Sequence, residues 1–379
     1  KIPNELGALI LLRYLYLGNN NITGKIPPTF GMFSQLRVLS MSGNSLTGAI
    51  PEMGQLSSLQ ILDLSNNDLT GSVPESIASL PSLVMINLSE NAPITGASAR
   101  FCDNRSYIIY IDLFVKDECW CCISKLDGNI NKKPPQSEPS TAPEMSLSQV
   151  SPTLAPSTSV HLDGSHTYIP THRPTKGSHA PTNEKNPVPE PPKQEDVRRN
   201  NDIFDALLAI TNESVLVDTT TFQNAAYRWL IDEDPMKMEA YDAGLYQRYS
   251  LIALFASTYG ARWRKKNSWL TGSSECEWFG ITCKWTLASG SSLVLSNPGL
   301  DDDDGLFPPV NRAVVSIKLP DNKLSGSLVD EIGILTSLVS IDLQSNSITG
   351  TIPGKMGSLL WLGEFLCVFS GRQKYWFPH

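Results

Sequence analysis

Apolar residues recur along two stretches of this chain in one fixed frame, LxxLxLxxNxLxG, in which other apolar residues can replace the leucines. The first copy places its residues at Leu12, Leu15, Leu17, Asn20, Ile22 and Gly24. Further copies end at Gly48, Gly71, Gly96, Gly326 and Gly350. A period of about 24 residues predicts a solenoid of the α/β class, in which each repeat makes one turn and buries its apolar side against its neighbours.

The LxL part of each copy predicts a short strand whose alternate residues point into the core or out of it. Leu15 and Leu17 should face the core, whereas Tyr14 and Tyr16 should face a partner on the concave side. Aromatic groups contribute much contact area, so these tyrosines are the expected anchors of a ligand; the alternative is that they are ordinary surface tyrosines. The complete predicted ligand-binding face is Tyr14, Tyr16, Ser40, Ser42, Asp63, Ser65, Asn87, Ser89, Lys318, Asp342 and Gln344.

The asparagine of each copy falls at the same place in the frame, immediately after the strand. A buried amide is costly unless both of its ends are hydrogen-bonded, so these side chains should stack as a ladder that satisfies backbone groups of adjacent turns. We expect them to be structural and none of them to bind a ligand. The predicted ladder is Asn20, Asn44, Asn67, Asn91, Asn322 and Asn346.

A second signature, L-T-G-x-I-P, follows the ladder residue, as in Thr23, Gly24, Ile26 and Pro27, and again in Thr349, Gly350, Ile352 and Pro353. In carrying this signature, the chain resembles the plant-type leucine-rich repeats of receptor-like kinases, receptor-like proteins and cell-wall enzyme inhibitors. One copy departs from the signature, with Val329 where the proline would stand. The resemblance implies short parallel strands on a concave face and a role in recognition or signalling.

The cysteines fall into three groups. Cys276 and Cys283 lie in a C-x-W-x-G-x-x-C pattern that resembles the N-terminal cap of plant-type arrays, which implies that they form a disulfide; the alternative is a buried pair of free thiols. Cys367 takes the place of an inward leucine and should be an unpaired buried thiol. Four further cysteines suggest a disulfide-stapled cap rather than a zinc site, and their pairing stays open: Cys102, Cys119, Cys121 and Cys122.

The region before the second array should be helical. One helix is expected to begin near Asn201 or Asp202, another at Thr219 or Thr220, and a third to run from Tyr246 to Tyr259. Together with the cysteine-clustered cap, this region resembles the leucine-rich-repeat proteins abundant in diatoms, in which it precedes the repeats. The tryptophans should form its packing core, with a sugar-binding platform as the alternative: Trp229, Trp263, Trp269 and Trp278.

Composition separates these parts. Residues 132–196 hold 13 prolines among many serines and threonines, so they cannot bury enough apolar surface to fold and should be a disordered linker. The expected order is 1–97 repeats in about four copies, 98–131 cysteine-containing C-terminal cap, 132–196 disordered linker, 197–311 helical and disulfide N-terminal cap, 312–369 repeats in two copies and a partial third, and 370–379 irregular tail.

Catalysis has little support in this sequence. Only His379 lies outside the linker among the histidines, and no phosphate-binding loop or kinase motif is present. The four acidic residues Asp301–Asp304 do not match a calcium loop, because Leu300 and Asn311 stand where ligands would be needed. We therefore expect a protein that is not an enzyme, with no cofactor and no metal.

Net charge and hydropathy limit the classes of partner that the chain is expected to bind. A net charge of −8 is too mild to indicate nucleic acid and has the wrong sign for an anionic membrane surface. No apolar run reaches the roughly 18 residues needed to span a bilayer, so we expect no membrane span here, although a longer chain could carry an anchor. The sequence favours an extracellular or cell-surface module that binds protein, peptide or glycan. The alternatives are a structural wall or matrix adhesion protein, or an inhibitor of a wall-degrading enzyme.

The order of the parts is unusual, because the chain resembles the end of one repeat protein joined to the beginning of another. The second array has only two intact copies, and in the third Ser370 stands where Asn346 stood one repeat earlier. Arrays of this kind need about three stacked units and a polar end. The sequence therefore predicts that the second array leaves an apolar edge open and does not fold stably alone.

Overall fold

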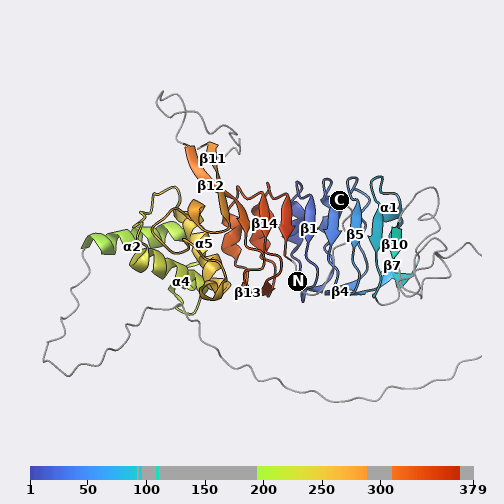
Figure 1. Cartoon of the computed structure of the whole chain (residues 1–379), viewed down its shortest axis with the longest axis horizontal. Coiled ribbons are helices and arrows are strands. Elements are labelled where there is room, and N and C mark those ends of the chain that lie inside the picture. The colour runs from blue at the N-terminus through green and yellow to red at the C-terminus, as the bar shows by residue number, and fades with distance from the viewer. Residues whose placement is uncertain (92–93, 96–107, 111–193, 288–309, 368–379) are drawn as a thin grey trace, which may run out of the picture.

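The computed structural model describes residues 1–91, 94–95, 108–110, 194–287 and 310–367. Coils stacked side by side form one elongated solenoid, with helices packed at one end (Figure 1). Its longest sheet contains β1 (Tyr14–Tyr16), β3 (Val38–Ser40), β5 (Ile61–Asp63), β8 (Met85–Asn87), β10 (Ile108–Tyr110), β11 (Ile281–Leu287), β12 (Val310–Lys318), β14 (Ser340–Asp342) and β16 (Glu364–Leu366).

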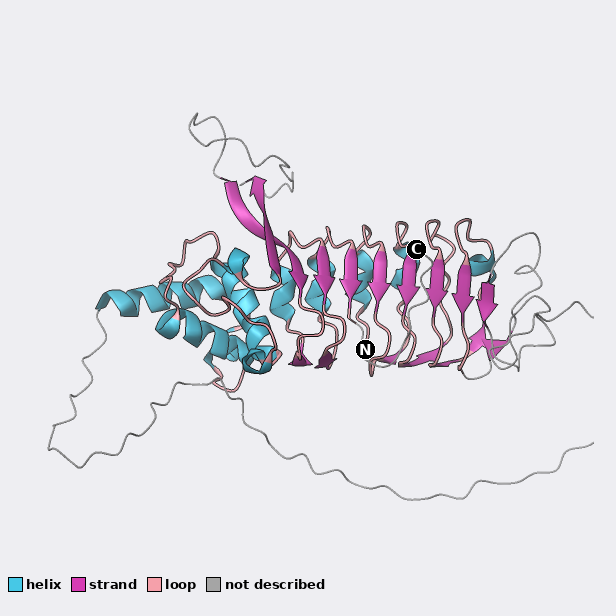
Figure 2. Cartoon of the chain, in the orientation of Figure 1, coloured by secondary structure: helices cyan, strands magenta, loops and turns pink. Residues whose placement is uncertain are grey.

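Shorter strands and turns of 3-10 helix complete each coil (Figure 2). The short strands lie along one edge of the solenoid and are β2 (Thr23–Gly24), β4 (Ser45–Gly48), β6 (Asp68–Leu69), β7 (Gly71–Ser72), β9 (Ile94–Thr95), β13 (Ser325–Ser327) and β15 (Ser347–Thr349). The helical turns lie opposite the long sheet and are η1 (Asn4–Ala8), η2 (Pro28–Met32), α1 (Glu75–Ala78), η9 (Asp330–Ile334) and η10 (Gly354–Ser358).

The two repeat regions, separate in sequence, stack in space as one array. The strand order of the long sheet is β10-β8-β5-β3-β1-β16-β14-β12-β11, so β16 pairs in parallel with both β14 and β1. The strands drawn in red and in blue accordingly lie side by side in Figure 1. The expectation of an open apolar edge on the second array is therefore wrong, because the coil of β1 covers it. We call this junction between β16 and β1 the seam.

Contacts at the seam resemble those between consecutive coils. A Cβ placed on Gly357 would lie 2.3 Å from the Glu5 carbonyl oxygen of the next coil, and one placed on Gly333 would lie 2.2 Å from the Lys355 carbonyl oxygen. Real Cβ atoms do not approach backbone so closely, so both positions need glycine for the coils to stack. At the helical turns the seam thus has the packing of an ordinary coil-to-coil contact.

Burial follows the predicted frame. The central residue of each strand points into the core, and Leu15, Leu39, Leu62, Ile341 and Phe365 are fully buried. The coils therefore share one continuous hydrophobic core, and burial of apolar surface between neighbours stabilises the array. In the L-T-G turns the glycine takes a left-handed conformation, with φ of 90° at Gly24 and 91° at Gly326, which other residues adopt only with strain.

The ladder asparagines bond to neighbouring coils. Asn67 donates from Nδ2 to the carbonyls of Met41, Leu64 and Ser65 at 3.0 to 3.1 Å, and its Oδ1 accepts the Leu46 N–H at 3.0 Å. Asn44, Asn91 and Asn346 make the same kind of contacts. At the end of the array, Asn322 bonds to the backbone of Lys265 and so ties the ladder to the helical cap.

The helical cap comprises α2 (Gln194–Leu207), α3 (Glu213–Val217), α4 (Phe222–Arg228), the π-helix η5 (Trp229–Glu233), α5 (Leu245–Ser257), η6 (Gly260–Arg262) and η7 (Glu275–Glu277). The first helix starts well before the expected Asn201 or Asp202, and three acidic or amide residues occupy its first turn. The second expected helix is α4. Its N-cap is Thr221, one residue after the expected Thr220, and the Thr221 hydroxyl accepts the Asn224 N–H at 3.0 Å.

Tryptophans form the core of this cap, as predicted. Trp229, Trp263, Trp269 and Trp278 are all buried, and the rings of Trp269 and Trp278 lie 4.8 Å apart. Arg248 lies over Trp229 and Trp278 and donates to both oxygens of the buried Asp234 at 2.7 and 2.8 Å. Both side chains of this charged pair are fully buried. The two hydrogen bonds between them give partners to polar groups that burial would otherwise leave unsatisfied.

The predicted disulfide between Cys276 and Cys283 is present, with an S–S distance of 2.00 Å. Cys367 is a free thiol, and burial raises its pKa to about 12. The expectations for Cys102, Cys119, Cys121, Cys122, the linker histidines and Asp301–Asp304 concern residues outside those that the structure describes.

Candidate functional site

The outward side chains of the long sheet form two aligned rows across the strands. Registered pairing places Tyr14 between Glu364 and Val38, and Tyr16 between Leu366 and Ser40. The first row runs Ser316, Ser340, Glu364, Tyr14, Val38, Ile61 and Met85. The second runs Lys318, Asp342, Leu366, Tyr16, Ser40, Asp63 and Asn87. The sheet thus brings both repeat regions together on one candidate ligand-binding face.

The middle of this face is aromatic and aliphatic. Tyr14, Tyr16 and Leu366 are partly buried and occupy neighbouring strands on the two sides of the seam. Apolar side chains with a polar tip, such as tyrosine, can cover a ligand and hydrogen-bond to it at the same time. Pairing across the seam therefore extends the predicted pair of tyrosines into a larger apolar platform.

Charged residues lie on the cap side of the seam. Lys318 and Asp342 are opposite each other on β12 and β14, and Glu364 follows on β16. Ser340 donates from Oγ to Glu364 at 3.3 Å. Burial raises the pKa of the Asp342 carboxyl above its ordinary value, against the N–H of Gln344 and the charge of Lys318, which lower it. The two carboxylates give this end of the face an acidic character.

Hydrogen bonds between polar side chains fix the other end of the face. Ser65 donates from Oγ to Asp63 at 2.7 Å, and Ser89 donates to Asn87 at 2.8 Å. Asn87 in turn donates from Nδ2 to Ser65 at 3.2 Å, which links the two strands. Asp63 and Asn87 are therefore held in one orientation, as a preorganised site for hydrogen bonding requires.

Three of the predicted face residues are buried. Ser42 and Ser89 have no exposed surface, and Ser65 retains 6%. They lie just beyond the strands, where the chain turns toward the ladder. Ser65 donates both its N–H and its hydroxyl to Asp63, and Ser89 donates both groups to Asn87. Ser65 and Ser89 therefore orient Asp63 and Asn87, and all three serines present little surface of their own to a ligand.

Other members of the face were missed in the sequence. Glu364 and Leu366 follow the same alternation as Tyr14 and Tyr16, and Ile61 and Met85 stand where Tyr14 stands in their coils. A consistent application of the period of two would have selected them. Their positions relative to the tyrosines depend on the seam, for which the sequence carries no local signal.

The described part of the chain contains no cluster of three or more His, Cys, Asp or Glu residues placed to hold a metal ion. Among the same residues, every helix is too short or too polar to cross a bilayer.

The comparisons with known proteins identify the repeats. Leucine rich repeat family models match residues 51–92 and 337–359, and a model of two Leucine Rich repeats matches residues 10–52. These ranges coincide with the coils on both sides of the seam. A search of the curated proteins finds no match to the chain.

Among solved structures, the chain is similar to the ectodomain of the receptor kinase GASSHO1/SCHENGEN3 from Arabidopsis thaliana, bound to CASPARIAN STRIP INTEGRITY FACTOR 2 (36% identity, TM-score 0.27, 29% of this chain and 14% of that one). It is also similar to the plant peptide hormone receptor RGFR1 in complex with RGF2 (35%, 0.28, 29% and 18%). A plant ice-binding protein matches as well (32%, 0.25, 30% and 39%). The matched region therefore spans well under half of each of these proteins.

Proposed function

We propose that this protein is a non-enzymatic recognition module that binds an extended peptide, or an exposed peptide segment of a protein, on the concave face. The single observation that carries the proposal is the continuity of this face across the seam. It places an apolar platform of Tyr14, Tyr16 and Leu366 between an acidic end and a rigid hydrogen-bonding end.

Each part of the face suggests a feature of the ligand. An apolar side chain would pack on the tyrosines, because aromatic residues commonly act as binding anchors. A basic residue would pair with Glu364 and Asp342, which lie diagonally across from each other on neighbouring strands. Peptide amides would bond to Asp63 and Asn87, whose orientation is fixed before binding. The ligand would lie across the strands, with its basic end toward the helical cap.

The test is a selection of displayed peptides against the whole chain, followed by affinity measurements on substituted proteins. Tyr16→Ala and Asp63→Ala should each weaken selected peptides by at least tenfold. Tyr241→Ala should leave the affinity unchanged, because this tyrosine is 85% exposed and belongs to the helical cap. Glu364→Gln should weaken only those peptides that carry a basic residue.

Peptides whose affinity is unchanged by both Tyr16→Ala and Asp63→Ala would remove the assignment of this face. Binding of glycans or of insoluble wall polymer, but not of peptides, would instead support the glycan ligand or the adhesion protein. Inhibition of a wall-degrading enzyme would support the inhibitor, which is a special case of protein recognition.

We also propose that the protein works outside the cell or at the cell surface. The disulfide between Cys276 and Cys283 supports this, since such bonds persist in oxidising compartments. Mass mapping of the non-reduced protein isolated from its source should find both cysteines bonded. Alkylation of Cys276 as a free thiol would contradict the extracellular placement without affecting the assignment of the concave face.

A further inference from the structure

The seam is complete in the long sheet but incomplete along the edge of the solenoid that carries the short strands. In the long sheet β16 pairs with the strand on each side. Along the edge, β13 and β15 form one sheet, whereas β2, β4 and β6 form another. Among the described residues no strand lies between β15 and β2, whereas every other described coil of the array contributes at least one strand to this edge.

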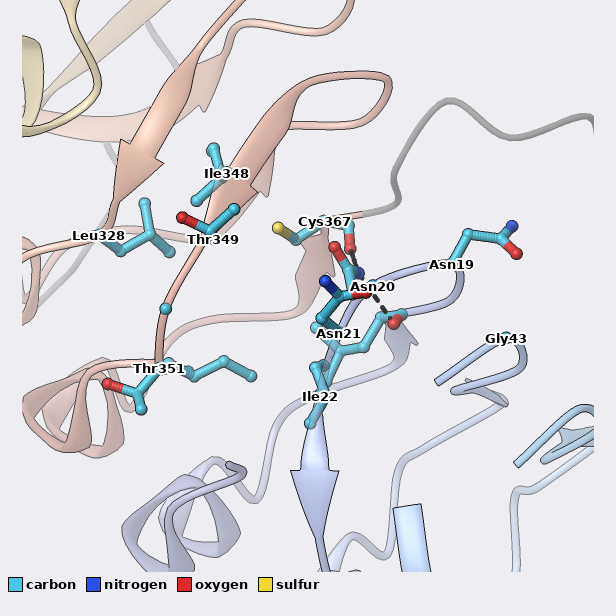
Figure 3. A pocket seen from close by; sticks show the side chains of 13 residues that line it. Asn19, Asn20, Asn21, Ile22, Gly43, Leu328, Ile348, Thr349, Thr351 and Cys367 are labelled. Carbon is cyan, nitrogen blue, oxygen red and sulfur yellow. Dashed lines mark hydrogen bonds between the residues drawn. The ribbon is translucent and has the colours of Figure 1, made fainter. Parts of the chain in front are cut away.

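A cavity of about 410 Å³ lies at this place and is lined by residues from both sides of the seam (Figure 3). Its apolar surface comes from Leu17, Ile22, Leu328, Ile348 and Cys367. In intact coils an aliphatic residue of the short strand fills the equivalent space, as Leu46 and Leu69 do with no exposed surface. The cavity therefore has the lining expected where the described residues supply no such segment.

The neighbouring coils define what the missing segment would contain. Register pairs Asp342 with Leu366, so Cys367 takes the place of Leu343. In the intact coil Leu343 is followed by Gln344–Gly350, with the sequence QSNSITG, before the next helical turn. These seven residues supply the ladder asparagine, the short strand and the left-handed glycine. The described residues provide no such segment between Cys367 and the coil of Lys1.

The hydrogen-bonding groups at the cavity match the same segment. In intact coils the N–H two residues after a ladder asparagine donates to the Oδ1 of the next one, as Ile22 does to Asn44 at 3.0 Å and Leu324 to Asn346 at 2.9 Å. No described asparagine stands in that place next to Ile348. On the other side of the cavity, Asn20 lacks the corresponding hydrogen bond from a described residue. Its Nδ2 donates to Cys367 at 2.6 Å, but its Oδ1 receives no hydrogen bond from the described residues.

We propose that the seam cavity binds an extended peptide segment of about seven residues that carries an asparagine and, two residues later, an aliphatic side chain. The segment adds a strand between β15 and β2, so that the two edge sheets become one. The peptide asparagine accepts the Ile348 N–H and donates to the Leu343 carbonyl. The N–H of the aliphatic residue donates to Oδ1 of Asn20, and its side chain packs between Ile348 and Ile22.

An extended peptide is the occupant that continues the pattern on both sides, since the cavity separates two parallel strand edges, β15 and β2, that pair with no described strand on this side. The residues that follow Cys367 do not carry the required pattern. Their sequence places Ser370 at the ladder position and Arg372 at the aliphatic position. A charged side chain would lose its hydration in a cavity lined by leucine and isoleucine.

The experiment measures fluorescence anisotropy of a labelled QSNSITG peptide with the whole 379-residue chain. We expect saturable binding, and a loss of at least tenfold when the peptide asparagine or isoleucine is replaced by aspartate. Thr351→Trp should also weaken binding by at least tenfold, because this exposed residue lines the cavity and the indole would fill it. Ser72→Trp, at the equivalent exposed position of another coil, should leave binding unchanged.

Hydrogen exchange locates the peptide independently of affinity. The peptide should slow exchange of the amides in β15 and β2, and it should do so equally in the Tyr16→Ala protein, whose substitution lies on the concave face. Absence of saturable binding, equal binding of the aspartate peptides, or equal losses in Thr351→Trp and Ser72→Trp would each overturn the proposal. Protection of the Ile348 amide in the free chain, without peptide binding, would show that the chain fills its own cavity and would also overturn it.

Discussion

One asparagine in each coil connects the backbone of three neighbouring segments. For Asn67 the amide bonds to Met41 and Leu64 as donor and to Leu46 as acceptor. Since the side chain is buried, removing it would leave several polar groups without partners. The ladder is therefore a structural requirement of the stack, which explains why the same residue recurs where surface residues vary.

Substitution of a ladder asparagine inside the array should cost more stability than substitution of the one at the seam. Asn67→Ala should lower the free energy of unfolding by about 2–4 kcal/mol, because it orphans buried donors and acceptors. Asn20→Ala should cost less, since Oδ1 of Asn20 accepts no hydrogen bond from the described residues. Urea denaturation of both proteins measures the difference. Equal losses would contradict the view that the ladder is interrupted at the seam.

Asp342 gives the concave face a dependence on pH. Burial raises the pKa of its carboxyl in the folded protein, so its contribution to stability is full below the unfolded pKa and is lost as the pH rises through the folded value. Asp342→Asn should therefore stabilise the protein at pH 7, by only a few tenths of a kcal/mol because the group is half-exposed to solvent screening. Thermal unfolding should show this gain at pH 7 and none at about pH 3. A gain that is the same at both pH values would refute the assignment.

At the scale of elements, the L-T-G turn joins the array to the helical cap. A Cβ on Gly326 would lie 2.2 Å from the Ser257 carbonyl oxygen at the end of α5, whereas one on Gly24 would meet only the Lys1 side chain at 3.5 Å. The two glycines have nearly identical φ values of 91° and 90°. Comparing a substitution at each glycine therefore separates the effect of backbone strain from the effect of the contact with the cap.

Gly24→Ala should cost about 1 kcal/mol, because alanine is strained at this φ. Gly326→Ala should cost that amount plus a displacement of α5 from the array, in total about 3–4 kcal/mol. Thermal unfolding compares the two proteins, and tryptophan fluorescence reports the cap directly. Similar losses in both would mean that the contact between Gly326 and Ser257 does not restrain the cap.

Elements with a strong local signal could be predicted from the sequence. The period of the leucines gave each coil and its inward residues, and Thr221 capped its helix within a residue of the expected position. The start of α2 at Gln194 was missed, because the acidic residues Glu195 and Asp196 favour a helix start as much as the later Asn201 does. The turn of π-helix from Trp229 has no recognisable sequence signal.

At the scale of the whole molecule, the order of the coils could not be read from the sequence. Pairing of Tyr16 with Leu366 joins residues 350 positions apart, and every strand of the long sheet offers the same backbone pattern to a neighbour. Periodicity determines how a coil folds but does not determine which coil it stacks on. The composition of the concave face and the cavity at the seam both depend on that choice.

The seam should hold the molecule together without a covalent connection. A protease site introduced between residues 111 and 193 and then cleaved should give two fragments that elute together in gel filtration. Gly357→Ala should separate them, because its Cβ would clash with the Glu5 backbone at 2.3 Å. Gly54→Ala, which meets only the Ser76 side chain at 3.0 Å within one fragment, should not. Fragments that separate without any substitution would show that β16 and β1 do not form a stable contact.

The pairing of β16 with β1 also has a consequence for biosynthesis. The coil of Tyr16 emerges from the ribosome before the strand that covers it, which follows 350 residues later. At translation rates of about 5–20 residues per second, the interval is roughly 20–70 s. During that time the coil of Tyr16 exposes a hydrophobic flank on which other chains can associate. Newly made protein should therefore depend on chaperones until its C-terminal coils are complete.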